Sequence, residues 1–164
     1  MKIRLVWFIL IFSFLVFACN DENVDDQTPE IDLSIEGAFP VNCDTLYFGE
    51  THTIRLLLQD NVELGSITAL SIDIHNNFDH HSHSTEVTEC NLDEEKNAVN
   101  PYVIIQSFDL PEGQSTYETS FELALPESNA GGDFDEGDYH FFISLADKEG
   151  WSVQKGLSIK ILHR

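Results

Sequence analysis

Short runs of alternating apolar and polar residues recur along the chain, separated by Gly, Pro, Asn and Asp. Alternation with a period of two is typical of β-strands with one buried face, and the period of an amphipathic helix is nearly absent. The pattern predicts one all-β domain over residues 30–164, an immunoglobulin-like, seven-stranded antiparallel β-sandwich. We expect its strands at Ile31–Ile35, His52–Gln59, Ile67–His75, Tyr102–Leu110, Tyr117–Leu125, Tyr139–Asp147 and Ser152–Leu162.

One local motif supports this fold class. The segment Asp135–Phe141 has the Asp-x-Gly-x-Tyr-x-apolar form of a tyrosine corner. In that motif the tyrosine, here Tyr139, starts a core strand, and its hydroxyl bonds back to the chain just upstream. The overlapping acidic segment Asp133–Asp138 has some likeness to a calcium loop, but it departs from the EF-hand pattern. The tyrosine corner explains it more simply.

Histidines are concentrated where the third expected strand ends. The segment Ile72–His83 contains four of the seven histidines in the chain. Side chains alternate between the two faces of a strand, so His75 points outward if its apolar neighbours point inward. The same argument places His140 outward on the strand that begins at Tyr139. These two strands are antiparallel neighbours in an immunoglobulin-like sheet, so we expect His75 and His140 to lie close together.

The chemistry of this cluster predicts a metal site. Neutral imidazole is the commonest metal ligand among side chains, and three or four imidazoles suit Zn²⁺, Cu²⁺ or Ni²⁺. Three nearby carboxylates can either supply an oxygen ligand or accept from the second ring nitrogen of an imidazole, namely Asp73, Asp79 and Glu86. A solvated histidine-rich loop around a structural His75 is the alternative. The predicted ligands are His75, His81, His83 and His140, with His80 as an alternative ligand.

The first residues have the form of a bacterial lipoprotein signal. Two basic residues precede the apolar run Leu5–Phe17, which is too short to span a membrane comfortably. The sequence Val16–Cys19 resembles a lipobox, in which the cysteine becomes the lipidated N-terminus. We therefore predict a signal peptide over residues 1–18 and a lipid on Cys19. An ordinary signal peptide that is cut nearby is the alternative.

The expected mature protein is strongly acidic. The chain has 8 basic and 29 acidic residues, and removal of Lys2 and Arg4 leaves 6 against 29, a net charge of −23. Such a charge attracts cations and excludes nucleic acid as a partner. Residues 19–29 read as an acidic flexible tether, and acids directly after Cys19 resemble the surface-export signal of Bacteroidetes lipoproteins. We expect an outer-membrane protein that faces the cell surface, with the periplasmic face as the alternative.

The remaining two cysteines form an even pair. If Cys19 carries a lipid, Cys43 and Cys90 are left, and a disulfide between them fits an oxidising compartment. Two thiolate metal ligands are the alternative. A disulfide here would hold the long loop that carries the histidines against the sandwich.

Three functions are open at this point. The first is capture of a divalent transition metal, or its delivery to an outer-membrane transporter. The second is a non-enzymatic protein- or glycan-binding accessory module of a surface complex, for which Phe78 and Phe142 are candidate exposed aromatic residues. The third is a metal-dependent hydrolase. The chain has no His-Glu-x-x-His helix, Gly-x-Ser-x-Gly elbow or phosphate-binding glycine loop, so we do not expect an enzyme.

Several segments also resemble a known family in the same order along the chain. These segments are Ile72–His83, Cys90, Val99–Pro101, Gly137–Phe141 and Asp147–Trp151. The likeness extends over roughly residues 28–162 and is to the DUF4625 family of uncharacterised Bacteroidetes envelope lipoproteins. It implies an immunoglobulin-like domain on a lipid anchor in the cell envelope, and it implies no activity.

Overall fold

A computed structural model describes residues 25–65 and 69–164, and these residues contain strands and no helix. The all-β prediction is therefore confirmed, while the predicted signal peptide and Cys19 lie outside the described residues. No helix in the described ranges is long and apolar enough to cross a membrane. The strands are β1 (Glu30–Asp32), β2 (Thr45–Tyr47), β3 (Thr51–Ile54), β4 (Leu57–Gln59), β5 (Leu70–Asn76), β6 (Ile104–Phe108), β7 (Thr116–Glu118), β8 (Phe121–Ala124), β9 (Ser128–Asn129), β10 (Gly132–Asp133), β11 (Gly137–Ala146) and β12 (Ser152–Leu162).

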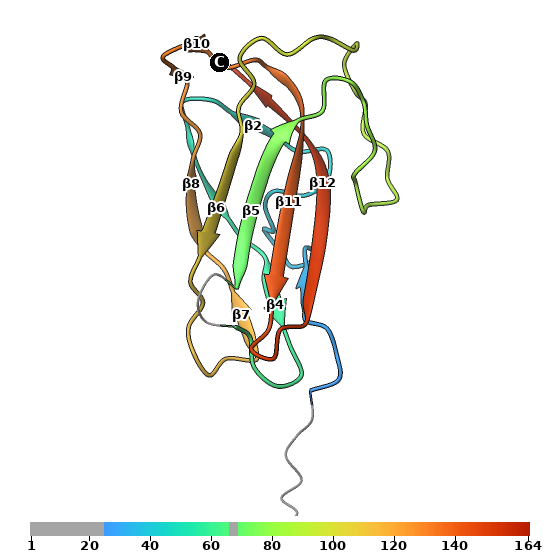
Figure 1. The fold of residues 1–164 in the computed structure, drawn as a ribbon, viewed down its shortest axis with the longest axis vertical. Coiled ribbons are helices and arrows are strands. Elements are labelled where there is room, and N and C mark those ends of the chain that lie inside the picture. Colours follow the sequence, from blue (N-terminus) through green and yellow to red (C-terminus); the bar gives the residue numbers. More distant parts are fainter. Residues whose placement is uncertain (1–24, 66–68) are drawn as a thin grey trace, which may run out of the picture.

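The larger layer is a five-stranded sheet in the order β2-β12-β11-β5-β6 (Figure 1). Strands β12, β11, β5 and β6 pair antiparallel with one another, and β2 joins β12 in parallel. The inward residues of β5 and β11 are apolar and buried, as the alternating pattern predicts. This sheet carries the histidines that the sequence singles out.

The second layer consists of two short sheets, β1-β4-β7 and β3-β8. The predicted strand His52–Gln59 is divided into β3 and β4, and Tyr117–Leu125 is divided into β7 and β8. The division lies where the hydroxyl of Thr119 accepts a bond from the amide of Leu56 at 3.1 Å and donates to the carbonyl of Ile54 at 3.0 Å. A buried threonine side chain therefore replaces part of the regular backbone pairing.

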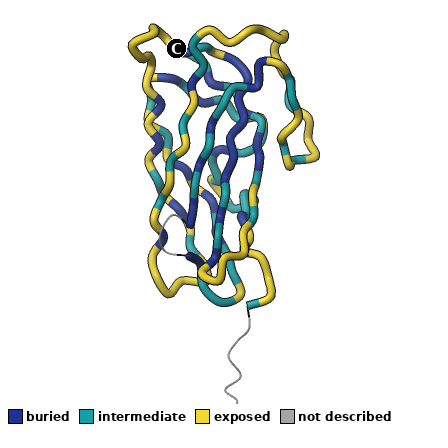
Figure 2. The backbone as a smooth tube through the Cα atoms, viewed as in Figure 1, coloured by how far each residue is buried: buried dark blue, intermediate teal, exposed yellow. Residues whose placement is uncertain are grey.

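One apolar core joins the two layers (Figure 2). Buried residues from the larger sheet, such as Ile72 and Phe141, belong to the same cluster as Leu58 and Leu123 of the second layer. The predicted tyrosine corner is present. The hydroxyl of Tyr139 donates to the carbonyl of Asp135 at 2.6 Å, and the amide of Tyr102 donates to that hydroxyl at 3.2 Å.

Other strand predictions differ from the structure mainly at their ends. The expected strand Ser152–Leu162 coincides with β12, whereas Ile31–Ile35 is represented by the shorter β1. The described residues also contain β2 and the β9–β10 hairpin, which the alternating pattern did not indicate. These strands are only two or three residues long, so they leave no periodic signal.

Candidate metal centre

The site begins with a pair of histidines on neighbouring strands. His75 of β5 lies directly opposite His140 of β11 in the antiparallel register, and their ring centroids are 5.3 Å apart. Residues opposite each other in such a pair point to the same face of the sheet. The prediction that these two side chains lie close together on one face is confirmed.

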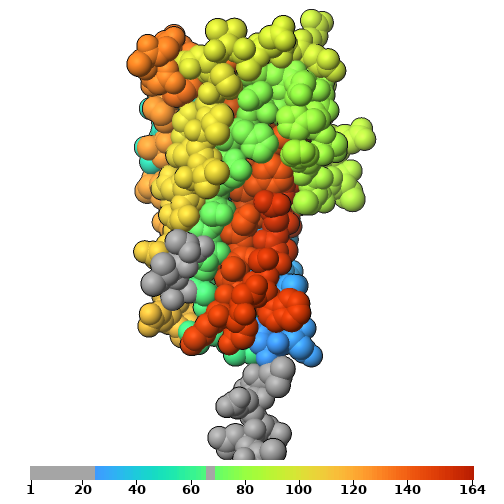
Figure 3. All heavy atoms as spheres, viewed as in Figure 1, coloured from blue at the N-terminus to red at the C-terminus, as the bar shows by residue number. Residues whose placement is uncertain are grey.

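Two further histidines come from the β5–β6 loop, residues 77–103. The loop turns back over the outer face of the larger sheet, and Figure 3 shows its atoms beside and over β11 and β12. The rings of His81 and His83 lie 4.9 and 5.1 Å from that of His140, and 4.7 Å from each other. One nitrogen of each ring lies within 4.8 Å of the others, in a histidine cluster made of His75, His81, His83 and His140.

A glycine on β12 lets the loop approach this closely. The amide of Thr85 donates to the carbonyl of Gly156 at 2.9 Å, and the amide of Gly156 donates to the Thr85 hydroxyl at 3.1 Å. A Cβ atom at position 156 would lie 2.5 Å from the carbonyl oxygen of His83. Any larger residue would therefore displace the segment that carries His83.

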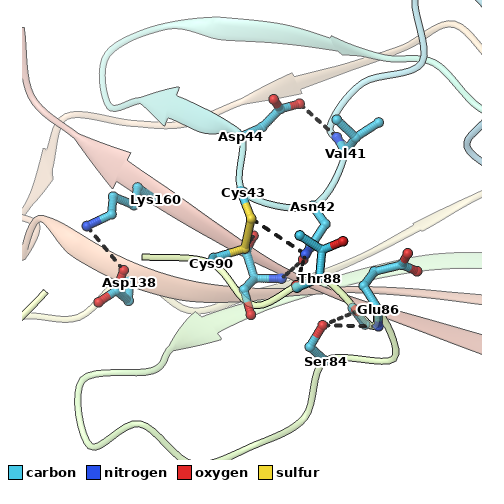
Figure 4. The surroundings of a disulfide bond; sticks show 12 residues. Val41, Asn42, Cys43, Asp44, Ser84, Glu86, Thr88, Cys90, Asp138 and Lys160 are labelled. Atoms are coloured by element: carbon cyan, nitrogen blue, oxygen red, sulfur yellow. Dashed lines mark hydrogen bonds and ion pairs between the residues drawn. A yellow bond between two sulfur atoms is a disulfide. The ribbon is translucent and has the colours of Figure 1, made fainter. Parts of the chain in front are cut away.

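The predicted disulfide between Cys43 and Cys90 is present and fastens the same loop further along (Figure 4). The amide of Cys43 donates to the carbonyl of Ser158 on β12 at 2.8 Å. The side-chain amide of Asn42 donates to the carbonyl of Thr88 at 2.7 Å. The loop is thus tied to one edge of the sheet both at Thr85 and at Cys90.

His140 is held in the neutral form that binds metals. It is 1% exposed, and its pKa is lowered to about 4 by burial first and then by the neighbouring histidines, His81 foremost. Its Nε2–H donates to the carbonyl of His81 at 3.2 Å, since a carbonyl can only accept. Its Nδ1 is buried without a hydrogen-bond partner. Nδ1 of His140 therefore keeps a free lone pair that a metal ion can accept.

Two carboxylates orient two of the other rings. The Nδ1–H of His75 donates to Asp73 at 3.1 Å, and the Nδ1–H of His81 donates to Asp79. The pKa of Asp79 is lowered chiefly by this hydrogen bond from His81. Both rings then present Nε2 as the free nitrogen. A carboxylate on the distal nitrogen of a metal-binding histidine is a common arrangement, because it sets the tautomer and raises ligand basicity.

Two residues from the predicted site lie elsewhere. His80 adopts a positive φ of 53°, and its ring faces Asp138 at 3.8 Å and Glu95 at 3.9 Å. It therefore turns away from the histidine cluster. Glu86 was predicted to hold an imidazole, but its carboxylate pairs with the ammonium group of Lys155 at 3.6 Å. A nearby cation on β12 is a better partner for this carboxylate than a neutral ring.

The expectation of exposed aromatic residues on this face is wrong. Phe142 is only 9% exposed, and its ring stacks on His75 with centroids 5.5 Å apart. Phe78 is also buried and packs edge-on against Tyr139. The folded-back loop covers the outer face, which the parity of the strand alone does not reveal. Phe142 and Gly156 are the supporting residues that sequence reasoning missed.

A pocket gives the histidine cluster access to solvent. Its volume is about 320 Å³, and it lies between the β5–β6 loop and the sheet, lined by His81, His83, His140 and Ser158 among others. His83 is itself exposed. An ion could therefore reach the ligands without unfolding of the loop.

The geometry fits a tetrahedral ion after a small contraction. Zinc binds imidazole nitrogen at about 2.0–2.1 Å, so four nitrogens in a tetrahedron lie about 3.4 Å apart. The separations here are at most 4.8 Å, so closing the site requires movements of about 1 Å. The rings of His81 and His83 stand on the β5–β6 loop, so a movement of this size costs little free energy.

Comparison with known proteins gives the family but no activity. The searches of curated proteins and of solved structures returned no match. The model of one family, described as a domain of unknown function, matches residues 17–162, which is nearly the whole chain. The chain therefore belongs to the DUF4625 family.

Proposed function

We propose that the protein binds one divalent transition-metal ion, Zn²⁺, Cu²⁺ or Ni²⁺, through His75, His81, His83 and His140. The observation that carries this proposal is the arrangement of the ring nitrogens. Three of the rings already have their other nitrogen engaged by Asp73, Asp79 or a backbone carbonyl. One nitrogen of each of the four rings lies within 4.8 Å of the others. A set of four neutral nitrogens with no thiolate favours these ions over Cu⁺, which prefers sulfur.

The number of ligands favours binding over catalysis. Catalytic zinc sites keep one position for water, whereas closed sites use four protein ligands. Four imidazoles fill a tetrahedron, so a hydrolytic water would have no place on the ion. We therefore propose a binding protein and not a metal-dependent hydrolase.

The position of the site favours an exchangeable ion. The cluster lies near the surface, one of its members is exposed, and a pocket leads to it. A net charge of −21 raises the local concentration of cations. These features suit capture of a metal, or its delivery to an outer-membrane transporter, better than a permanently locked structural ion.

Attachment of the protein to the envelope is part of the same proposal. The lipobox-like sequence that ends at Cys19 and the acids after it support a lipid anchor in the outer membrane, with the domain facing the cell surface. Incorporation of labelled palmitate should be lost in a Cys19→Ser variant. Labelling equal to that of the wild type would contradict the anchor.

An immunoglobulin-like topology is the finer proposal for the fold. It is supported by the tyrosine corner at Tyr139 and by the adjacency of β5, β11 and β12 in one sheet. An experimental structure that places these strands in a different order would contradict it.

Isothermal titration of metal-free protein with Zn²⁺ and Cu²⁺ tests the binding proposal. We expect one ion per chain and no binding heat in a variant with all four cluster histidines replaced by alanine. His80→Asn is the matched control, because His80 lies in the same loop outside the cluster and asparagine tolerates its positive φ. This control should bind like the wild type. Equal heats for the wild type and the quadruple variant would refute the proposal.

A further inference from the structure

A second group of ligand-like side chains lies at the other end of the sandwich. Asp25 precedes β1, Asp60 follows β4, and Asp147 follows β11. In Figure 1 the start of the described chain, the end of β4 and the turn after β11 meet at the lower end of the molecule, away from the β9–β10 hairpin. One carboxylate oxygen of each residue lies within 4.8 Å of the others, and we call this group the carboxylate cluster.

Each carboxylate is already fixed through one of its oxygens. Asp60 accepts from the amide of Val62 at 2.7 Å, and Asp25 accepts from the amide of Gln27 at 3.2 Å. Oδ1 of Asp147 accepts from two amides of the following turn, including that of Trp151 at 2.8 Å. Backbone donors thus set the orientation of all three side chains before any ion arrives.

The second oxygen of each carboxylate has no partner. Oδ2 of Asp25, Oδ1 of Asp60 and Oδ2 of Asp147 are buried and make no hydrogen bond. Asp147 is only 5% exposed, so its bare oxygen is enclosed by the protein within the carboxylate cluster. Within the described ranges, no ion pair joins Lys, Arg or His to any of the three. Lys148, the basic neighbour of Asp147, is instead paired with Glu63 at 2.7 Å.

Three carboxylates with buried, unbonded oxygens in one cluster need a nearby positive charge to stabilise their ionised form. Burial and mutual repulsion both disfavour three negative groups, and a bound cation reverses both effects. Oxygen-only ligands suit hard cations. Calcium accepts six to eight oxygens in flexible geometry, with waters completing the set, whereas magnesium demands a near-ideal octahedron. Ligands from three separate segments, two of them half-exposed, fit the calcium requirement better.

We propose that Asp25, Asp60 and Asp147 bind Ca²⁺, and that the ion fastens the segment before β1 to the end of the sandwich. The site is independent of the histidine cluster in both position and ligand chemistry. Its role is to stiffen the junction between the folded domain and the acidic residues that precede it.

Terbium luminescence with the full-length chain tests this site. Tb³⁺ occupies calcium sites and is excited through a nearby indole, and the amide of Trp151 bonds directly to Asp147. We expect one luminescent site that Ca²⁺ displaces. Asp60→Asn should weaken Ca²⁺ binding at least tenfold, and the quadruple histidine variant should leave it unchanged. Asp44→Asn is the matched control, since Asp44 also accepts from a nearby backbone amide, that of Val41, but lies beside β2.

Thermal unfolding separates loss of the site from loss of the fold. In the presence of a chelator, Asp60→Asn should have a higher melting temperature than the wild type, because one of the three mutually repelling charges is gone. In the presence of Ca²⁺, the wild type and Asp44→Asn should gain stability, whereas Asp60→Asn should not. Absence of Ca²⁺-displaceable luminescence in the wild type, or an unchanged affinity in Asp60→Asn, would overturn the site. Equal affinity for Mg²⁺ would overturn the assignment to calcium.

Discussion

Gly156→Ala is the most informative single substitution for the histidine cluster. Gly156 lies on β12 beneath the β5–β6 loop, where a Cβ atom would meet the carbonyl oxygen of His83 at 2.5 Å and the ring of Phe142 at 2.7 Å. The ring belongs to a side chain and can shift slightly. The carbonyl belongs to the backbone of the loop, so the loop itself has to move away from the sheet.

The expected magnitude follows from what the displaced loop gives up. Overpacking of this kind costs about 1–3 kcal/mol. The hydrogen bonds between Thr85 and Gly156 are strained as well, at about 0.5–1.5 kcal/mol each if they are lost. For metal affinity we expect a loss on the order of 10–100-fold, the usual effect of removing a group that positions a ligand. The affinity should approach that of His83→Ala.

Urea unfolding in chelator and isothermal titration with Zn²⁺ measure the two effects. Gly113→Ala is the control, because its positive φ of 73° makes alanine unfavourable there while no heavy atom lies within 4 Å of the added carbon. It should lose about 1 kcal/mol of stability and keep the wild-type zinc affinity. Wild-type zinc affinity in Gly156→Ala would refute the idea that close packing of the loop on β12 positions His83.

The remaining predictions concern the groups around the cluster. Asp73→Asn and Asp79→Asn should each lower zinc affinity by about 10–100-fold in titrations, because each carboxylate orients an imidazole through Nδ1. An unchanged zinc affinity would contradict that role. Replacing Cys43 and Cys90 by serine should lower the unfolding free energy by about 4 kcal/mol in urea titrations, given the 47-residue separation. A loss below about 1 kcal/mol would show that the reduced loop is held by other contacts. In chelator, the wild type should lose stability as pH falls from 6.5 to about 4. Between these two pH values, His140 takes up a proton in the unfolded state but stays neutral in the folded state, where its pKa is about 4. The loss is a few kcal/mol at most and should be smaller in His140→Asn; an equal pH slope in both proteins would contradict it.

The part of the site on regular strands could be predicted from the sequence. Alternation along β5 and β11 sets which residues face outward, and the antiparallel register then places His75 opposite His140. The tyrosine corner marks where β11 begins. The even cysteine pair likewise predicts the link between Cys43 and Cys90. Each of these inferences depends on a local rule of strand geometry or of composition.

The path of the β5–β6 loop could not be predicted in this way. It depends on tertiary contacts with no periodic signal, such as the close approach of His83 to Gly156. For this reason Phe142 reads as an exposed aromatic residue in the sequence and is buried in the structure. The pairing of Glu86 with Lys155 has the same origin, because the two residues are far apart in the chain.

X-ray absorption at the metal edge of the zinc-loaded protein tests the central claim most directly. The account predicts four nitrogen ligands at about 2.0 Å, with the outer-sphere scattering pattern of imidazole rings and no sulfur. A spectrum dominated by oxygen ligands, or one that shows fewer than three imidazoles, would contradict the proposal that His75, His81, His83 and His140 bind one ion together.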